Sequence, residues 1–291
     1  MSARTGWQEV GDRVFRYRYD AFDLNVGAVV GDDEILVIDT RGWRTQAEEL
    51  RRDLRRLRPL PWRHVVNTHA HFDHCFGNEL FREAAIWGHE RCAENLRTRG
   101  EEQRANTIAW LERSGAGRAS AGAGELAAVE IVPPDRLVGE RASLVVGGRR
   151  VELRHLGRGH TDNDLVVVVP DAEVVFAGDL VEEGAPPSYG DAFPLEWPAT
   201  AARLLEIPAA AVVPGHGDVV DHAFVRAQGE ELTAMADLCR RVRLGELSPE
   251  AALAQAPFPE PCARQALAVR RHLTRVAAAV GDAGRPGRQP R

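Results

Sequence analysis

Segments in which apolar residues recur with the period of a strand alternate along the chain with segments in which they recur with the period of a helix. Residues 12–40 predict a β-meander, because short alternating or apolar runs are separated by turn residues. Leu50, Leu54 and Leu57 recur at helical spacing and predict a helix over residues 46–57. The elements expected next are a buried strand at 64–67, a short helix at 78–84 and a short strand at 85–87.

Residues 89–130 interrupt this alternation and form an insertion. Residues 89–114 are polar and compatible with a helix, whereas 114–124 consist almost entirely of glycine, alanine, serine and one arginine. Such small-residue composition predicts a flexible loop. The insertion is either a lid over a site or a surface helix pair, and the pattern leaves both interpretations open.

The β pattern resumes after residue 137, and the chain then turns helical. Strands are expected at 143–146, 150–156, 165–169, 174–177 and 211–213, and helices at 199–206, 222–243 and 249–280. The order of β-rich, helical, β-rich and helical segments predicts an α/β fold with sheets between helices. Residues 281–291 are rich in glycine, proline and arginine and predict a disordered tail.

Composition narrows the function classes. The 291 residues carry a net charge of −6 and contain no lysine, which excludes a Schiff-base lysine and a Walker-type phosphate lysine. The negative charge predicts a small-molecule substrate rather than nucleic acid or a membrane surface. Because no apolar stretch could span a bilayer and residues 1–10 lack the apolar core of a secretory signal, we expect a cytoplasmic protein. The four scattered cysteines argue against a disulfide framework.

The strongest chemical signal lies directly after the apolar pair at residues 65–66. His69, His71, Asp73 and His74 fall within six positions there. Imidazole and carboxylate groups are the ligands that zinc and similar divalent ions prefer. Loops that leave a strand end are where a rigid scaffold commonly holds catalytic groups. The cluster therefore predicts a metal site.

Three further residues of ligand type lie next to expected strands and next to glycine. They are His160, Asp179 and His216. Glycine lets the backbone pass close to a metal or a substrate without a clash. Taken singly, each of these residues is a poor ligand candidate, but their order after the first cluster makes a complete set.

The ligand count permits two sites. Three histidines, His69, His71 and His160, can form one site with an open fourth position, and Asp73, His74 and His216 can form a second. The carboxylate of Asp179 has two oxygens and could bridge both. Two metals about 3.5–4 Å apart can hold a shared hydroxide and polarise the bond that it attacks.

These motifs resemble the metallo-β-lactamase superfamily, in its broad hydrolase branch that includes glyoxalase II. The resemblance runs from about residue 25 to residue 216. It implies a four-layer αββα sandwich with the metals at one edge of the sheets. It also implies that Asp39 supports the site from outside the ligand set. We therefore expect a catalytic domain at residues 1–220, with helices at 221–280 packed on it.

The ligands implied by the resemblance agree with the count. They are His69, His71 and His160 at the first site, Asp73, His74 and His216 at the second, and Asp179 as the bridge. The implied activity is that of a dinuclear zinc hydrolase whose bridging hydroxide cleaves an ester, thioester, lactone or amide bond of a small molecule. Asp73 is the expected catalytic residue, orienting the nucleophile and passing on its proton.

Several alternatives stay open. Iron or manganese could replace zinc in one or both sites. A mononuclear iron enzyme similar to persulfide dioxygenases, or a cytoplasmic enzyme similar to β-lactamases, could use the same scaffold. Residues 185–197 combine prolines with aromatic residues and are a candidate pocket wall. There Tyr189 could donate a hydrogen bond to a substrate oxygen, or it could simply pack the loop on the core.

Overall fold

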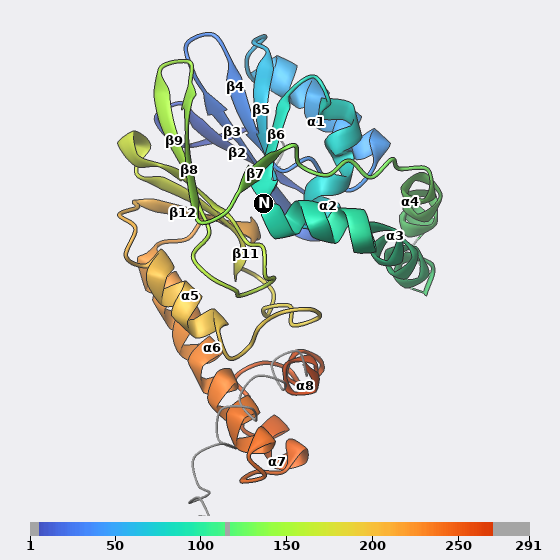
Figure 1. The fold of residues 1–291 in the computed structure, drawn as a ribbon, viewed down its shortest axis with the longest axis vertical. Helices are drawn as coiled ribbons and strands as arrows, with labels where there is room; N and C mark the ends of the chain where they lie inside the picture. Colours follow the sequence, from blue (N-terminus) through green and yellow to red (C-terminus); the bar gives the residue numbers. More distant parts are fainter. Residues whose placement is uncertain (1–5, 114–116, 270–291) are drawn as a thin grey trace, which may run out of the picture.

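A computed structural model describes residues 6–113 and 117–269 of the chain. Its strands form one continuous mixed sheet of 12 strands within these ranges, in the order β7-β6-β5-β4-β3-β12-β11-β10-β9-β8 (Figure 1). In addition, β2 pairs with β3, and β1 pairs with β2. The sheet consists of two halves, which join where His216 of β12 pairs with Leu24 of β3. The joint between the halves therefore contains one of the expected metal ligands.

The first half of the sheet comes from the first half of the chain. Its strands are β1 (Gln8–Gly11), β2 (Val14–Tyr19), β3 (Leu24–Val30), β4 (Ile35–Ile38), β5 (Trp62–Val66), β6 (Ala85–His89) and β7 (Arg136–Val138). Between them lie η1 (Ala21–Asp23), α1 (Arg44–Leu57), α2 (Phe72–Cys75), η2 (Phe76–Phe81), α3 (Glu90–Arg113) and α4 (Gly117–Ala127).

The second half of the sheet is followed by the C-terminal helices. Its strands are β8 (Arg141–Val146), β9 (Arg149–Arg154), β10 (Val166–Val169), β11 (Val174–Glu182) and β12 (Ala211–His216). The helical segments are η3 (Pro170–Ala172), α5 (Trp197–Leu204), α6 (His222–Arg243), α7 (Pro249–Leu253) and α8 (Glu260–Ala268).

Strand periodicity sorts the apolar side chains into separate cores. On β4, Leu36 and Ile38 point into a core between the two half-sheets, while Ile35 and Val37 point to the opposite face. The central core also receives alternate valines of β10 and β11. Because successive side chains of a strand point to opposite faces, each fully buried strand supplies two cores.

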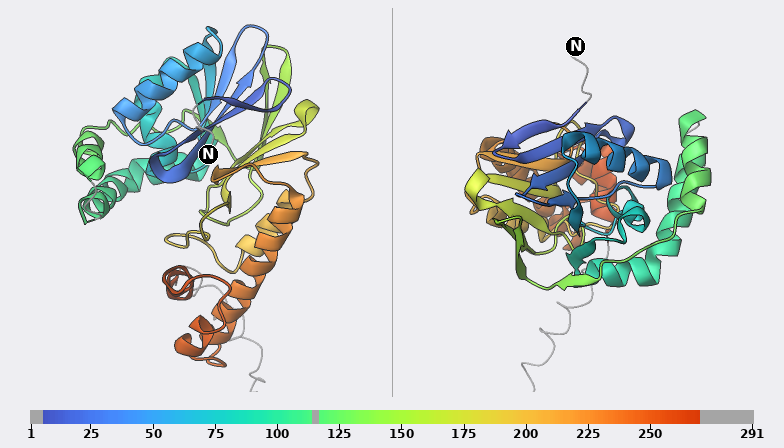
Figure 2. Two further views of the ribbon diagram at one scale, coloured as in Figure 1. Left: turned by 180° about the vertical axis from the view of Figure 1, so that it is seen from behind. Right: turned by 90° about the horizontal axis from the view of Figure 1, so that it is seen from above.

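The outer faces of the two half-sheets are covered by helices. Leu50 and Leu54 of α1 pack on the first half, and Trp197 of α5 and Met235 of α6 pack on the second. Figures 1 and 2 show these helices on the outer sides of the sheets. The layers are therefore helix, sheet, sheet and helix, which confirms the expected αββα sandwich.

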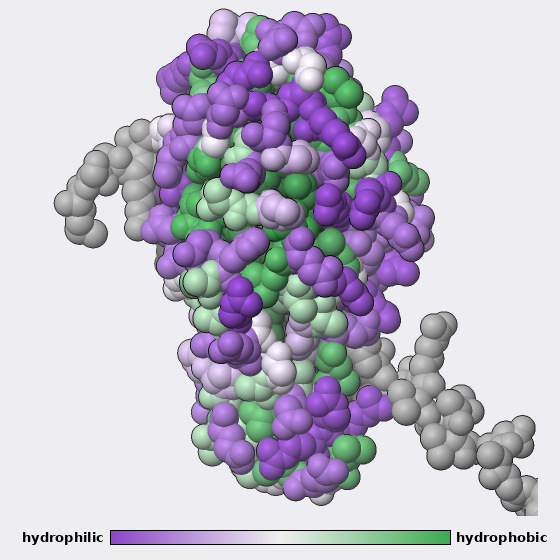
Figure 3. Space-filling view, turned by 90° about the vertical axis from the view of Figure 1, so that its left-hand side faces the viewer, coloured by the Kyte–Doolittle hydropathy of each residue, from purple (hydrophilic) through white to green (hydrophobic). Residues whose placement is uncertain are grey.

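The C-terminal helices form an arm that leaves the sandwich. α6 continues past the sheets, and α7 and α8 lie against its far part (Figure 1). Figure 3 shows the flank on the side of β8, β9 and β12, where hydrophilic residues surround small apolar groups. The apolar faces of these helices belong to the same hydrophobic core as β10 and β11. The arm and the second half-sheet therefore share one core.

Three sequence-based expectations are wrong in detail. A flexible loop was expected over 114–124, but residues 117–124 lie in helix α4. Over residues 249–269, the described part of the helix expected at 249–280, the chain forms two separate helices, α7 and α8, because Pro257 and Pro259 cannot continue a helix. Residues 270–280 lie outside the described residues. Strand β11 runs on to Glu182, so Asp179 lies inside it rather than after it.

The described helices do not include one that is long and apolar enough to cross a membrane. The tail expected to be disordered, residues 281–291, lies outside the described residues.

Candidate metal centre

All seven expected ligands meet at one edge of the two half-sheets. His69 and His71 lie on the loop after β5, Asp73 and His74 in α2, His160 on the loop before β10, Asp179 in β11, and His216 at the end of β12. They form two groups, within each of which one ligand atom per residue lies within 4.8 Å of the others: His69, His71, His160 and Asp179, and Asp73, His74 and His216.

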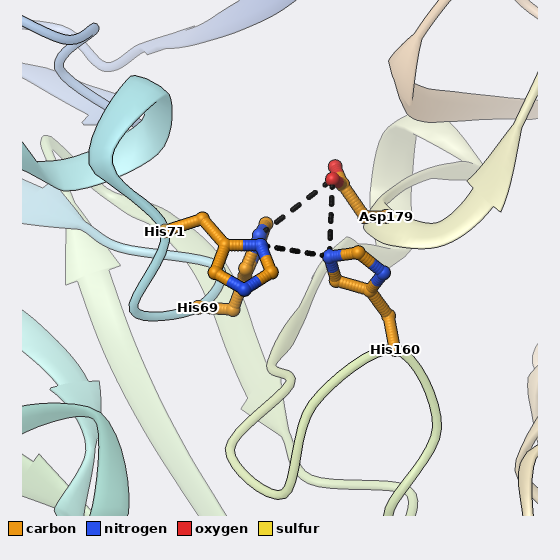
Figure 4. Close-up of side chains that lie close together, drawn as sticks. All are labelled: His69, His71, His160 and Asp179. Atoms are coloured by element: carbon orange, nitrogen blue, oxygen red, sulfur yellow. Dashed lines mark hydrogen bonds and ion pairs between the residues drawn. The ribbon is translucent and has the colours of Figure 1, made fainter. Parts of the chain in front are cut away.

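The first group brings three imidazoles and one carboxylate together, as Figure 4 shows. Nε2 of His160 lies 2.9 Å from Nδ1 of His71. Oδ2 of Asp179 lies 3.3 Å from Nε2 of His160 and 3.6 Å from Nε2 of His69. Imidazole nitrogens and carboxylate oxygens thus converge on one small volume.

The second group lies on the other side of Asp179. Nε2 of His74 and Nε2 of His216 are 3.4 Å apart. Oδ2 of Asp73 lies 3.8 Å from the former and 3.7 Å from the latter. These are the residues expected to hold the second metal.

Asp179 lies between the two groups. In addition to its contacts with the first group, its Oδ1 lies 3.2 Å from Nε2 of His74 and its Oδ2 lies 3.3 Å from Nε2 of His216. Gly215 makes room for this carboxylate, since a Cβ there would lie 1.8 Å from Oδ1. The carboxylate has the position that a bridging ligand requires.

The donor set fits divalent cations. Within the described part of the chain, Nε2 of His69 and Oδ1 of Asp179 are buried without a hydrogen-bond partner. Buried polar atoms ordinarily have partners, because leaving one unpaired costs about 1–3 kcal/mol. Imidazole nitrogens and carboxylate oxygens aimed at each other are what zinc and related ions bind.

One carboxylate orients the histidines at the base of the site. Nδ1 of His74 donates to Oδ2 of Asp39 at 2.8 Å. Asp39 also accepts from the backbone N–H and the hydroxyl of Thr68, both at 2.8 Å. The Thr68 hydroxyl oxygen in turn lies 3.1 Å from Nδ1 of His69. Protons on both Nδ1 atoms leave both Nε2 lone pairs directed into the site, and the expected role of Asp39 is confirmed.

Two further partners orient two of the three remaining histidines, His71 and His216, in the same way. Nε2 of His71 donates to Oδ1 of Asp191 at 3.0 Å, which leaves Nδ1 for the site. Nδ1 of His216 donates to the carbonyl oxygen of Phe22 at 2.7 Å. Phe22 has a φ of 65°, a left-handed conformation that is rare for a bulky residue. Strain of this kind persists where the surroundings hold it.

The pKa values reflect burial and neighbouring charge. Burial lowers the pKa of His160 to about 4 and that of His69 well below its ordinary value. Burial also opposes the charged form of His71, but the carboxylates of Asp191, Asp179 and Asp73 together outweigh it and raise its pKa to about 9. Burial alone would raise the pKa of Asp179, yet the surrounding histidines hold it well below its usual range.

The two groups lie at the base of a pocket of about 870 Å³. One wall is α3, which the insertion at 89–130 contributes. The opposite wall is the loop after β11, within the segment expected to be a pocket wall, through Ser188, Gly190 and Asp191. Tyr189 of the same loop is 1% exposed and packs on Trp197 and Phe258. The structure therefore places Tyr189 in the core rather than against a substrate.

Two supporting groups lie far along the chain from the histidines that they orient, and the sequence pattern does not predict them. Asp191 lies 120 residues after His71, with no motif around it. The carbonyl of Phe22 is a backbone group, whose role no residue type reveals. The one available signal was the chemistry of residues 185–197, which pointed to the correct loop but to the wrong side chain.

Comparisons with known proteins agree with this geometry. The family model of the metallo-β-lactamase superfamily matches residues 19–216. A type 2 metallo-β-lactamase of Bacillus cereus is 27% identical over 168 residues, which cover 55% of this chain and 54% of the relative. The chain thus spans about half the length of that relative. The acyl-coenzyme A thioesterase MBLAC2 of Gallus gallus is 27% identical over 236 residues, 75% of this chain and 81% of the relative.

Solved structures show the same fold. A metallo-β-lactamase from Pontibacter korlensis superposes with a TM-score of 0.59 at 21% identity, covering 78% of this chain and 98% of that one. The metallo-β-lactamase DIM-1 gives the same TM-score at 20% identity, with 78% and 95% covered. With the αββα layers, the two ligand groups and the family match over residues 19–216, the chain belongs to the metallo-β-lactamase superfamily.

Proposed function

We propose that the protein is a dinuclear zinc hydrolase that cleaves a carbonyl–heteroatom bond of a small molecule. The observation that carries the proposal is Asp179, whose two oxygens face both ligand groups at the base of an open pocket. A site for a single metal would need no second group on the far side of this carboxylate. Two bound ions would lower the pKa of a water and polarise the substrate carbonyl.

Asp73 is the residue proposed to act on the proton. It lines the pocket. One side of its carboxylate faces His74 and His216, and the other side faces the open pocket. A carboxylate in this position can accept the proton of the attacking water and later donate it to the leaving group. His71 and His160, which also line the pocket, hold the other face of the site.

Among the possible bonds, a thioester is the first choice. The thioesterase MBLAC2 is matched over 81% of its length, whereas the Bacillus β-lactamase is matched over 54%. A match over most of a relative supports a common reaction more strongly than one over half of it. Esters, lactones, amides and β-lactams remain in the test.

The test begins with the purified chain, stripped of metal and reloaded with zinc, iron or manganese. We expect two zinc ions per chain by elemental analysis and hydrolysis of at least one member of a thioester, ester, lactone and β-lactam panel. Asp73→Asn should lower kcat by roughly 10²–10⁴-fold. Val145→Ala, at an exposed position on β8, is the matched control and should keep full activity.

Two outcomes would contradict the proposal. Hydrolysis that persists after complete metal removal would exclude a metal-dependent reaction. Tight binding of one iron per chain, with oxygen consumption in the presence of a persulfide and no hydrolysis, would instead identify a persulfide dioxygenase.

A further inference from the structure

An aromatic wall forms one side of the pocket above the ligand groups. Its members are Phe22, Phe72 and Trp110, all of which line the pocket. The rings of Phe22 and Phe72 meet edge to face with centroids 5.3 Å apart, and those of Phe22 and Trp110 lie 6.2 Å apart. This is a continuous apolar surface beside the proposed reaction centre.

Each member of the aromatic wall comes from a different element. Phe22 lies in η1, where its carbonyl accepts the hydrogen bond from His216. Phe72 begins α2 and directly follows His71 in the sequence. Trp110 lies on α3, and 48% of its surface is exposed. A large apolar side chain exposed at a pocket, next to metal ligands, indicates contact with a ligand.

The charge around the pocket is predominantly acidic. Among the described residues that line it, Arg99 is the one arginine, and it pairs with Glu102 of the same helix. Glu183, the first residue after β11, adds a further carboxylate to the lining. A negatively charged substrate group lodged away from the metals would meet like charge, which raises its free energy of binding.

We infer that the substrate carries an apolar, uncharged acyl group that packs against the aromatic wall of Phe22, Phe72 and Trp110. This inference rests on the proposed function, because it places the scissile carbonyl at the ligand groups and the acyl group on the wall. It adds to that function that the pocket distinguishes substrates by their acyl group.

The first experiment uses zinc-loaded protein and a series of straight-chain acyl thioesters of N-acetylcysteamine, from acetyl to decanoyl. kcat/KM should rise roughly threefold for each added methylene until the wall is filled. In Trp110→Ala, the octanoyl-to-acetyl ratio should fall by roughly tenfold, as two methylenes lose apolar contact. The control Leu244→Ala removes an apolar side chain that is 64% exposed at the end of α6. It should leave the ratio unchanged.

The second experiment compares hexanoyl with adipoyl thioesters, which differ by a terminal carboxylate. Hexanoyl should be favoured at least tenfold in kcat/KM. Equal rates for the two, or a flat chain-length series in the unaltered protein, would overturn the inference. Binding of uncleavable alkyl thioethers, followed by calorimetry, separates the two proposals. If no member of the thioester, ester, lactone and β-lactam panel is hydrolysed, the proposed function fails, whereas a Kd that does not fall with increasing chain length contradicts the inferred role of the aromatic wall.

Discussion

Each histidine of the centre uses one ring nitrogen for the site, and four of the five direct the other to a definite partner. The partner of His69 is the Thr68 hydroxyl and that of His71 is Asp191. The partner of His74 is Asp39 and that of His216 is the Phe22 carbonyl. Such contacts fix the tautomer and the ring orientation and raise the basicity of the ligand. Residues outside the proposed ligand set therefore also hold the site in a geometry suited to metal binding.

The contact between Asp191 and His71 can be tested by mutation. Asp191→Ala should weaken zinc binding by roughly 10–100-fold, because His71 loses the acceptor that orients its ring. Asp191→Asn keeps an acceptor oxygen and should recover part of that loss. Competition with a chromophoric chelator measures the affinity. Asp237→Asn, which removes an exposed carboxylate on α6, serves as the control. Unchanged zinc affinity in Asp191→Ala would refute the role.

Metal binding should also depend on pH. Burial opposes the charged form of His216, but the carboxylates of Asp179 and Asp73 together outweigh it and raise its pKa to about 9, the same value as for His71. Below that pH these nitrogens are protonated in the metal-free protein, and the protons must be released when metal binds. Apparent zinc affinity should therefore rise from pH 6 to about pH 9 and then level off. Calorimetry in buffers of different ionisation enthalpy should detect the released protons at pH 7, and an affinity independent of pH would contradict the assignment.

At this scale the sequence predicts ligands better than their partners. The seven proposed ligands share a residue chemistry. Four of them cluster just after a strand and the other three stand beside strands and glycines, so local pattern finds them. Asp191 and the Phe22 carbonyl become visible only when the chain is folded, because tertiary structure alone brings them to the histidines. Tyr189 shows the converse, since an aromatic residue in the correct loop has its ring in the core.

At the scale of elements, packing explains where the sequence pattern failed. Residues 117–127 contain several glycines and alanines, yet they form α4. Gly122 of this helix lies so close to Trp43 that a Cβ would stand 2.9 Å from its ring. The small residues allow close contact with α1 and α3, and tertiary contact outweighs their low helix propensity. Local composition could not reveal that partner.

Because the two half-sheets approach closely, we expect one glycine between them not to tolerate a larger side chain. A Cβ at Gly27 of β3 would lie 2.5 Å from the Phe176 ring and 2.8 Å from Ile38. Gly27→Ala should lower the free energy of unfolding by about 1–3 kcal/mol through overpacking. Gly139→Ala is the matched control, since its Cβ would meet nothing within 4 Å. Urea denaturation compares the stability of the two variants. Equal midpoints of unfolding would contradict the prediction, because they would show that the two half-sheets can move apart without loss of stability.

At the scale of the whole molecule, the ligands come from segments spread between residues 69 and 216. They can meet only after both half-sheets have formed and joined. An unfolded chain therefore offers no comparable site, so metal binding adds directly to the stability of the folded state.

Metal removal should accordingly lower thermal stability. Free zinc at 1,000 times its Kd should raise the free energy of unfolding by about 4 kcal/mol relative to the stripped protein. Thermal denaturation with and without a chelator measures the shift. In a variant with His69→Ala and His74→Ala, which removes one ligand from each group, the difference should be largely lost. A shift of the same size in that variant would place the stabilising metal elsewhere.

The turn at Phe22 performs two tasks with two separable parts of one residue. Its carbonyl orients His216, and its ring forms part of the aromatic wall. The first task depends on the backbone alone, whereas the second depends on the side chain. Substitution at this position can therefore change which substrates fit while the second ligand group keeps its geometry. Residues that adopt the left-handed conformation readily, asparagine and glycine, are the ones most accessible to such change. In evolution, substrate range and metal chemistry can thus diverge independently at a single site in the chain.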